Sequence, residues 1–330
     1  MIMNVKKALV GSFPKNPKLG KVISWYNTGK INKEKLEKHI SENIKKLFEL
    51  AGNIKLEYTT NGLFRWDDIV DVTFGFISGT EKGPLQRFFD NNFYYRQPII
   101  KEKINVKKRE ENSFLQDLEF SRKIKEEVSL PSKLKAVIPG PLTYYVLSDN
   151  RYYNSPIELM MDYASVVNSL SQELSSVVDA IEIHEPAIYT NNIKRDILEK
   201  LPEIYKSMLD NVKIEKHLIT YFEINNLKRL DTLFSLPVDY FGIDVIENLK
   251  KLGRVYTYFS SRKVYLGMLN ARNTKMERIT TIIRVYNSVK RKGVSDVIIG
   301  NNTLFDFIPE VVVVKKLKLL KKLEKVEINE

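Results

Sequence analysis

The stretch AIEIHEPA at residues 180–187 contains the pattern that decides the fold. It begins as a short apolar run of strand length, and His184 and Glu185 follow at the end of that run. Similar apolar runs recur along the chain, and longer segments with helical periodicity lie between them. The runs that we predict to be strands span residues 6–12, 54–60, 135–140, 180–185, 216–222, 239–245, 263–269 and 296–300.

The helical segments between these runs lie at residues 33–50, 156–178, 191–209, 275–290 and 309–324. Eight strands that alternate with helices within 330 residues are typical of a (β/α)8 barrel, the α/β fold also called a TIM barrel. A doubly wound open sheet is the alternative, but no G-x-G-x-x-G pattern follows the first strand. Residues 79–128, after the second strand, are too many for a simple connection, and we expect an excursion with a hairpin and a helix there. We therefore predict one barrel domain over residues 1–330.

The composition excludes several kinds of protein. Hydrophobic residues make up 43% of the chain and charged residues 28%, a balance that is typical of globular domains. The absence of cysteine excludes disulfides, a cysteine nucleophile and cysteine-ligated metals. No apolar run approaches the roughly 20 residues that cross a membrane, and the apolar stretch before Pro14 is too short for a signal peptide. We therefore expect a cytoplasmic protein with no membrane partner. Abundant lysine, isoleucine and tyrosine without cysteine also fit a heat-adapted source.

The net charge of +12 suggests an anionic ligand or an acidic partner. No recognisable nucleic-acid-binding module accompanies this charge, so we expect no nucleic acid among the partners. Part of the excess lies in residues 311–330, where lysines alternate with leucines. That pattern is typical of a terminal amphipathic helix with a solvated lysine face.

In a barrel of this kind the active site lies at the carboxyl ends of the strands, and most of the predicted ends carry polar side chains. His184 and Glu185 are the candidate catalytic pair, because an imidazole beside a carboxylate can transfer protons at about pH 7. A hydrogen-bonded network without turnover is the alternative. The candidate ligand-binding residues are polar or basic groups of these loops: Lys15, Lys18, Lys21, Arg65, Arg96, Asn270 and Arg272. For each cation taken alone, a solvated surface side chain is the alternative.

Short motifs occur in a fixed order along the chain: GSFPK at 11–15, WYNTGKI at 25–31, NGLFRWDD at 61–68, YRQPII at 95–100, GPLT at 140–143, IHEPA at 183–187 and LGMLNARN at 266–273. In this order and at this spacing they resemble the cobalamin-independent methionine synthases, although no single motif is specific. Full-length members of that family have two barrels, of which the second is catalytic and zinc-bearing and the first is zinc-free. GPLT, EPA and ARN resemble the first barrel, whereas YRQPII resembles the catalytic barrel and the single-barrel archaeal enzymes.

The resemblance implies that the family's zinc site is lost. Catalytic barrels bind zinc through a His-x-Cys pair, a Glu and a Cys, and the matching residues here are His217, Ile219, Asp244 and Thr303. Isoleucine binds no metal, and both thiolates are missing. We therefore predict no zinc, with His217, Asp244 and Thr303 as vestigial positions. The resemblance also implies an altered homocysteine pocket, because an acid of the family is missing before Arg65 and His184 replaces an aspartate.

The resemblance implies two alternative functions. The first is a zinc-less accessory subunit, a pseudoenzyme, that assists methyl transfer to homocysteine in methionine biosynthesis. Its partners would be a separate zinc-bearing catalytic methionine synthase barrel and an acidic methyl carrier, either a methylated pterin or folate or a protein-borne carrier. The second is a stand-alone enzyme similar to 5-methyltetrahydropteroyltriglutamate–homocysteine S-methyltransferase, or another one-carbon transferase. We expect no cofactor except a methylated pterin or folate as methyl donor. Lys15 matches a basic position for the folate tail in the family, although residues 17–20 depart from the family's pattern.

Overall fold

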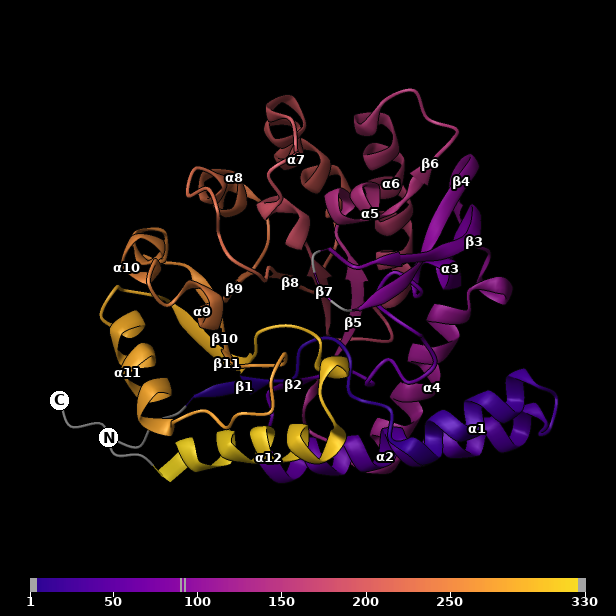
Figure 1. Ribbon diagram of the computed structural model, residues 1–330, viewed down its shortest axis with the longest axis horizontal. Helices are drawn as coiled ribbons and strands as arrows, with labels where there is room; N and C mark the ends of the chain where they lie inside the picture. The colour runs from indigo at the N-terminus through magenta and orange to yellow at the C-terminus, as the bar shows by residue number, and fades with distance from the viewer. Residues whose placement is uncertain (1–4, 90, 92, 326–330) are drawn as a thin grey trace.

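The computed structural model describes residues 5–89, 91 and 93–325, except for the side chains of residues 324 and 325. Eight parallel strands form a closed barrel in the order β1-β11-β10-β9-β8-β7-β5-β2 (Figure 1). The prediction of a (β/α)8 barrel is therefore confirmed. The barrel strands are β1 (Lys6–Ala8), β2 (Tyr58–Thr59), β5 (Lys133–Pro139), β7 (Ala180–His184), β8 (Glu215–Ile219), β9 (Tyr240–Asp244), β10 (Lys263–Leu269) and β11 (Asp296–Asn301).

Each predicted strand overlaps a strand of the barrel, but the first strand ends at Ala8, well before its predicted end at residue 12, and the second strand is also shorter than predicted. Its predicted first residue, Ile54, instead ends a helix, and the strand contains only Tyr58 and Thr59. Lys55 has a left-handed backbone with a φ of 58° and caps that helix, so the chain turns before the strand begins. The barrel closes tightly at Gly300, where a Cβ atom would lie 2.2 Å from the carbonyl oxygen of Ala8.

Helices cover the outside of the barrel and bury apolar faces against it, and each predicted helix overlaps one of them. In α6, for example, Leu159, Tyr163 and Leu170 recur at helical spacing and are fully buried. No helix in the described part of the chain is long and apolar enough to span a membrane. The helices are α1 (Pro17–Asn27), α2 (Lys33–Ile54), α3 (Thr73–Phe76), α4 (Ser113–Glu127), α5 (Pro141–Leu147), α6 (Pro156–Leu174), α7 (Arg195–Met208), α8 (Arg229–Ser235), α9 (Val245–Asn248), α10 (Leu252–Val255), α11 (Ile279–Lys290) and α12 (Glu310–Lys321).

The predicted excursion after the second strand is also present. It contains an antiparallel hairpin of β3 (Ile77–Arg87) and β4 (Tyr94–Val106), to which β6 (Asp149–Asn150) adds a short third strand, and then helix α4. Near the hairpin turn, the ring of Phe89 lies 5.6 Å from that of Phe222, and the ring of Phe93 lies 5.0 Å from that of Phe307. Since Phe222 and Phe307 follow barrel strands β8 and β11, the hairpin turn reaches the carboxyl-terminal end of the barrel.

Polar side chains fill the opposite, amino-terminal end of the barrel. The hydroxyl of Tyr240 donates to Asp296 Oδ2 at 2.5 Å, and Lys6 Nζ lies 2.5 Å from the same oxygen. The hydroxyl of Tyr58 donates to Glu215 Oε2 at 2.5 Å. These contacts join strands that are distant in the sequence, so they stabilise closure at the end where barrels rarely carry chemistry.

Candidate functional site

The carboxyl-terminal mouth of the barrel contains a cavity of about 920 Å³. Loops after β5, β7, β8, β9 and β10 line it together with the hairpin turn. Its walls combine aromatic rings, amides and opposite charges, as in Phe89, Tyr145, Tyr189, Asn192, Glu223 and Arg272. This volume and mixture are typical of sites for small organic ligands.

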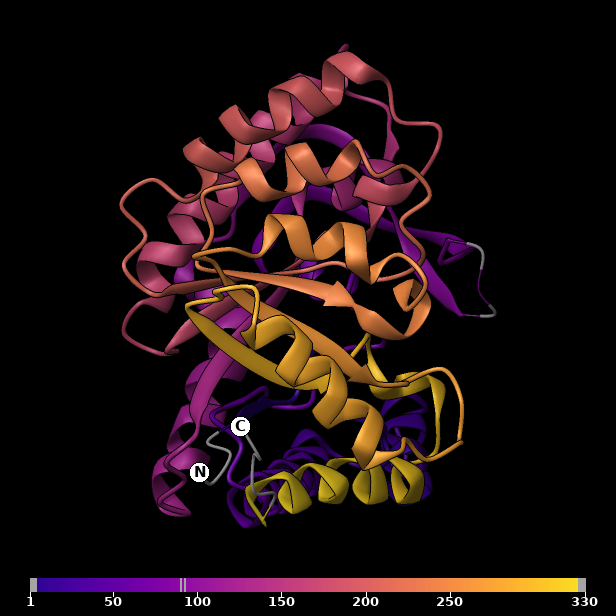
Figure 2. The same ribbon diagram turned by 90° about the vertical axis from the view of Figure 1, so that its left-hand side faces the viewer.

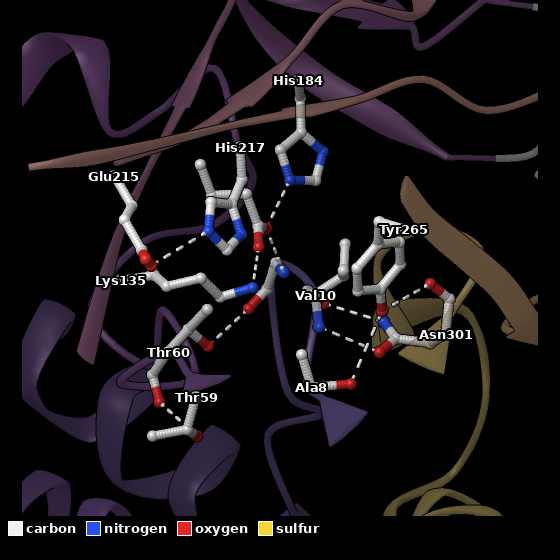
Figure 3. Close-up of polar contacts among 12 residues, drawn as sticks. Ala8, Val10, Thr59, Thr60, Lys135, His184, Glu215, His217, Tyr265 and Asn301 are labelled. Atoms are coloured by element: carbon white, nitrogen blue, oxygen red, sulfur yellow. Dashed lines mark hydrogen bonds and ion pairs between the residues drawn. The ribbon is translucent and has the colours of Figure 1, made fainter. Parts of the chain in front are cut away.

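A buried charge cluster lies inside the barrel, below this mouth. His184 Nε2 lies 2.7 Å from Glu182 Oε1, and Lys135 Nζ bonds to the other carboxylate oxygen (Figure 3). The backbone N–H of Gly11 also donates to Glu182 Oε1, at 2.7 Å. All three side chains are fully buried. Burial alone would raise the pKa of Glu182, but the charge of Lys135 and the hydrogen bond from His184 lower it to about 2. Glu182 is therefore an ionised carboxylate that binds both neighbours.

This geometry orients the imidazole of His184. Because ionised Glu182 accepts from Nε2, the neutral ring carries its hydrogen there and keeps the lone pair on Nδ1. Among the described residues, Nδ1 has no hydrogen-bond partner. The ring packs edge-on against Tyr221, with 5.6 Å between ring centroids. A base oriented by a carboxylate is a common catalytic arrangement. His184, however, is fully buried and is not among the residues that line the mouth cavity.

Glu185 points away from His184, because successive strand residues face opposite sides of the sheet. Its carboxylate accepts from the backbone N–H of Thr143 at 2.6 Å, from the Thr143 hydroxyl at 2.5 Å and from the Tyr205 hydroxyl at 2.7 Å. Burial raises the pKa of Glu185 to about 7, although these donors oppose the rise. The structure therefore pairs His184 with Glu182, two residues earlier, and does not bring the predicted pair together. Glu182 and Lys135 are not among the predicted site residues, although the same strand alternation places residues 182 and 184 on one face.

The predicted ligand-binding arginines are already paired with carboxylates. Arg65 lies 2.5 Å from Glu37 and 2.5 Å from Asp117. Arg272 Nη2 lies 2.7 Å from both Asp244 Oδ2 and Glu247 Oε1. Much of the positive charge at these positions is therefore neutralised within the chain.

The predicted cationic residues Lys15, Arg65 and Arg272 also line separate cavities. Lys15 lines a cavity of about 530 Å³ beside Asp306, and its Nζ donates to the Trp66 carbonyl at 2.7 Å. Arg65 lines a different cavity of about 580 Å³, and Arg272 lines the mouth cavity. The structure therefore distributes these three groups among three sites.

The remaining predicted binding residues are exposed or shape the backbone. Lys18 and Lys21 are exposed on α1, where the ammonium of Lys21 lies 4.8 Å from the ring centroid of Trp25. Arg96 is exposed on β4, 3.5 Å from the carbonyl oxygen of Gly83. Asn270 Oδ1 accepts from the backbone N–H of Arg272 at 2.9 Å, so it shapes the loop that presents Arg272.

The residues at the family's zinc positions do not fit that metal. His217 lies inside the barrel against Tyr58 and Tyr240, with ring centroids 4.6 and 4.7 Å away, and its Nε2 is 3.7 Å from Glu215 Oε2. Residue His217 of β8 pairs with Tyr240 of β9, and Asp244 lies at the other end of β9. At the usual rise of a strand, Asp244 is therefore about 13 Å further along the barrel than His217. Among the described residues, no three His, Asp or Glu side chains are placed to hold a metal ion.

The carboxylate of Asp244 is occupied by protein donors. Besides Arg272, it accepts from Asn302 Nδ2 at 3.0 Å and from the backbone N–H groups of Glu247 and Phe222 at 3.1 and 3.3 Å. Burial raises the pKa of Asp244, and the charge of Arg272 opposes that rise. Its role in the structure is to hold the loops after β8, β9 and β10 together.

Three polar atoms near the mouth have no hydrogen-bond partner among the described residues. They are the hydroxyls of Tyr221 and Thr303, both fully buried, and Nη1 of Arg272. Burial raises the pKa of Tyr221, whereas Arg272 and a contact with Thr303 oppose that rise. Of these three residues, Arg272 lines the mouth cavity, so its guanidinium is the group that a ligand in the mouth would contact.

The geometry agrees with comparisons to known proteins. The family model described as the N-terminal domain of cobalamin-independent synthase matches residues 78–294. A methionine synthase from Sulfolobus acidocaldarius is 27% identical over 284 residues, which cover 83% of this chain and 77% of the relative. A methionine synthase from Saccharolobus solfataricus is 26% identical over 299 residues, which cover 86% of this chain and 81% of the relative.

Solved structures share the fold. A B12-independent methionine synthase from Shewanella sp. W3-18-1, in complex with selenomethionine, has a TM-score of 0.76 at 15% identity and covers 97% of both chains. A putative vitamin-B12-independent methionine synthase from Listeria monocytogenes has a TM-score of 0.74 at 17% identity and covers 98% of both chains. Because the family model matches more than half of the sequence, the chain belongs to the cobalamin-independent methionine synthase family.

Proposed function

We propose that this protein is a zinc-less accessory barrel that assists methyl transfer from a methyl carrier to homocysteine, together with a separate zinc-bearing catalytic barrel. Relatives that carry the name methionine synthase support methionine synthesis as the process. The match to an N-terminal domain supports a role beside the catalytic barrel, since the resemblance implies that the first barrel is zinc-free.

The occupied carboxylate of Asp244 is the observation that carries this proposal. Methyl transfer to a thiol needs the thiolate, and zinc bound by thiolates and imidazole supplies it in the family. Here the chain has no cysteine, and the oxygens of Asp244 are taken by Arg272, Asn302 and two backbone N–H groups. A metal at this position would have to displace Arg272 and break the loop network around it.

The lining of the mouth cavity supports a methylated pterin or folate as the methyl carrier. Aromatic rings such as those of Phe89, Tyr145 and Tyr189 offer stacking surfaces, and Asn192 offers both a donor and an acceptor. A flat heterocycle with ring nitrogens matches these walls. An acidic carrier would add attraction to the net charge of +12.

The orientation of His184 favours a second candidate, a stand-alone one-carbon transferase. Its Nδ1 has no described hydrogen-bond partner, and Glu182, which is itself held by Lys135, fixes the ring from the other side. Such a base could accept a thiol proton directly, without a metal. This candidate requires turnover by the isolated chain.

The two candidates differ in one assay. Purified protein, with zinc supplied, is incubated with homocysteine and a methylated folate, and methionine is measured over time. The accessory role predicts no methionine above the protein-free control. Methionine formation that disappears in a His184→Gln variant would establish the second candidate instead. Elemental analysis of the same preparation checks the metal, and one tightly bound zinc per chain would contradict the zinc-less site.

A further inference from the structure

A groove on the outside of the barrel lies between helices α2 and α12, and its volume is about 630 Å³. Figures 1 and 2 show these two helices side by side along one edge of the molecule. The groove is distinct from the mouth cavity, since the lining of the mouth comes from hairpin and loop residues on other elements.

The floor of the groove is mainly apolar, although Asn43 and Asn53 also line the groove. Helix α2 contributes Leu47 and Leu50, which helical spacing places on one face, and α12 contributes Val314. Two loop residues, Phe13 and Phe64, complete the floor and pack edge-on with ring centroids 6.2 Å apart. The floor therefore offers contacts to an apolar body.

The rim of the groove carries an excess of positive charge. Four of its lining residues are lysines and two are acids; the lysines are Lys46, Lys318, Lys321 and Lys322, and the acids are Glu49 and Glu310. None of these lysines forms an ion pair or side-chain hydrogen bond with another described residue. The neighbouring Lys316 behaves differently, because it is fully buried and lies 2.5 Å from Glu277 Oε1. Helix α12 therefore uses one lysine for internal structure and leaves others at the groove.

The size of the groove favours a small occupant. Phe13, Leu47 and Phe64 are each 4% exposed or less, so most of the apolar surface open to a ligand comes from the half-buried Leu50 and Val314. A polypeptide helix is about 10 Å across with its side chains and would rest on the rim. A volume of about 630 Å³ instead lies within the usual range for small-molecule sites.

We propose that the α2–α12 groove is a binding site for a small organic anion with an apolar body and a carboxylate, phosphate or sulfonate end. The apolar body lies on Leu47, Leu50 and Val314, and the acidic end lies among the ammonium groups of the rim. Long lysine side chains suit this arrangement, since their stems cover apolar surface while their charged ends stay in water. The site is independent of the proposed role in methyl transfer.

The test uses anilinonaphthalene sulfonate, an apolar anion whose fluorescence rises in apolar sites, titrated into the full-length protein. We expect saturable binding at one principal site. The variant Lys318→Glu/Lys321→Glu should weaken that binding at least about tenfold, because it replaces attraction with repulsion at the rim. Lys213→Glu/Lys292→Glu is the matched control: both lysines are exposed outside α2 and α12, and the change in net charge is the same. This control should change the affinity less than about threefold, as expected for screened distant charge.

A second variant tests shape without changing charge. Val314→Trp fills the groove and should abolish the high-affinity signal, while an unchanged thermal midpoint shows that the fold persists. Equal affinity for the wild type and both groove variants would place the probe elsewhere and overturn the proposal. Equal losses of probe affinity in the rim variant and in its matched control would mean that only the net charge matters. That result would also overturn the proposal. The outcome is separable from the methyl-transfer role, since no substrate or partner is present.

Discussion

At the scale of single residues, the interior of the barrel places the carboxylate of Glu182 between Lys135 and His184. Changing Glu182 to Gln leaves the fully buried ammonium of Lys135 without its counter-charge. We expect this change to lower the free energy of unfolding by about 3–5 kcal/mol, measured by urea denaturation. The double variant Lys135→Met/Glu182→Gln should recover part of that loss, because it removes the unpaired charge. A loss below about 1 kcal/mol in the single variant would contradict the ion pair.

Glu185 predicts a specific pH dependence of stability. Its pKa in the folded protein is raised from the usual 4.5 to about 7, so the folded state holds this proton more tightly than the unfolded chain. The stabilisation is fully present below about pH 4.5 and is lost as the pH rises through about 7. At roughly 1.4 kcal/mol per pKa unit, the loss amounts to about 3 kcal/mol.

Comparison with Glu185→Gln isolates this effect, because glutamine does not titrate and other groups cancel in the difference. The difference in unfolding free energy between the wild type and this variant should decrease as the pH rises from about 4.5 to about 7. Urea denaturation at several pH values measures it. Parallel curves for the two proteins would show that the carboxyl group of Glu185 has an ordinary pKa.

At the scale of elements, the buried Lys316 anchors helix α12 to the loop after β10. Its Nζ lies 2.5 Å from Glu277 Oε1 and 2.5 Å from the carbonyl oxygen of Lys275. Lys316→Met should cost about 3 kcal/mol of unfolding free energy, since Glu277 loses its counter-charge. Lys315→Met, one residue earlier and exposed, should change stability by less than about 0.5 kcal/mol. Equal effects in thermal or urea unfolding would mean that Lys316 is not an anchor.

The elements were largely predictable because they depend on local patterns. Short apolar runs give strands, and helical periodicity gives helices, so the barrel and the hairpin excursion follow from the sequence. The failure at Ile54 has a local cause, since helix α2 continues through an apolar residue that also suits a strand. Strand ends could be located only to within a few residues, because capping geometry such as that of Lys55 decides them.

The site was less predictable, because its contacts join distant parts of the chain. Arg65 is 52 residues from its partner Asp117, and Arg272 is 28 residues from Asp244. The sequence alone does not reveal the ion-pair partners of such arginines, whereas in the folded chain each arginine contacts a carboxylate. Strand alternation could have selected Glu182 beside His184, but the buried Lys135 on another strand could be assigned only from the folded barrel.

At the scale of the whole molecule, the net charge of +12 is distributed unevenly between the mouth and the outer helices. Carboxylates hold Arg65 and Arg272 at the barrel's loops, whereas Lys318, Lys321 and Lys322 have no described ion pair. The positive charge of Arg65 and Arg272 is therefore largely neutralised within the chain, whereas Lys318 and Lys321 on α12 remain able to attract an anion. Recognition of a methyl carrier at the mouth would depend on stacking as well as on charge.

The accessory role is tested most directly by titrating this protein into a limiting amount of a zinc-bearing catalytic methionine synthase barrel from the same source. The measured quantity is the rate of methionine formation from homocysteine and a methyl donor. The account predicts a rate that rises with added protein and saturates near one chain per catalytic barrel, while this protein alone forms no methionine. A rate that stays constant throughout the titration, or methionine formation by this protein alone, would contradict it.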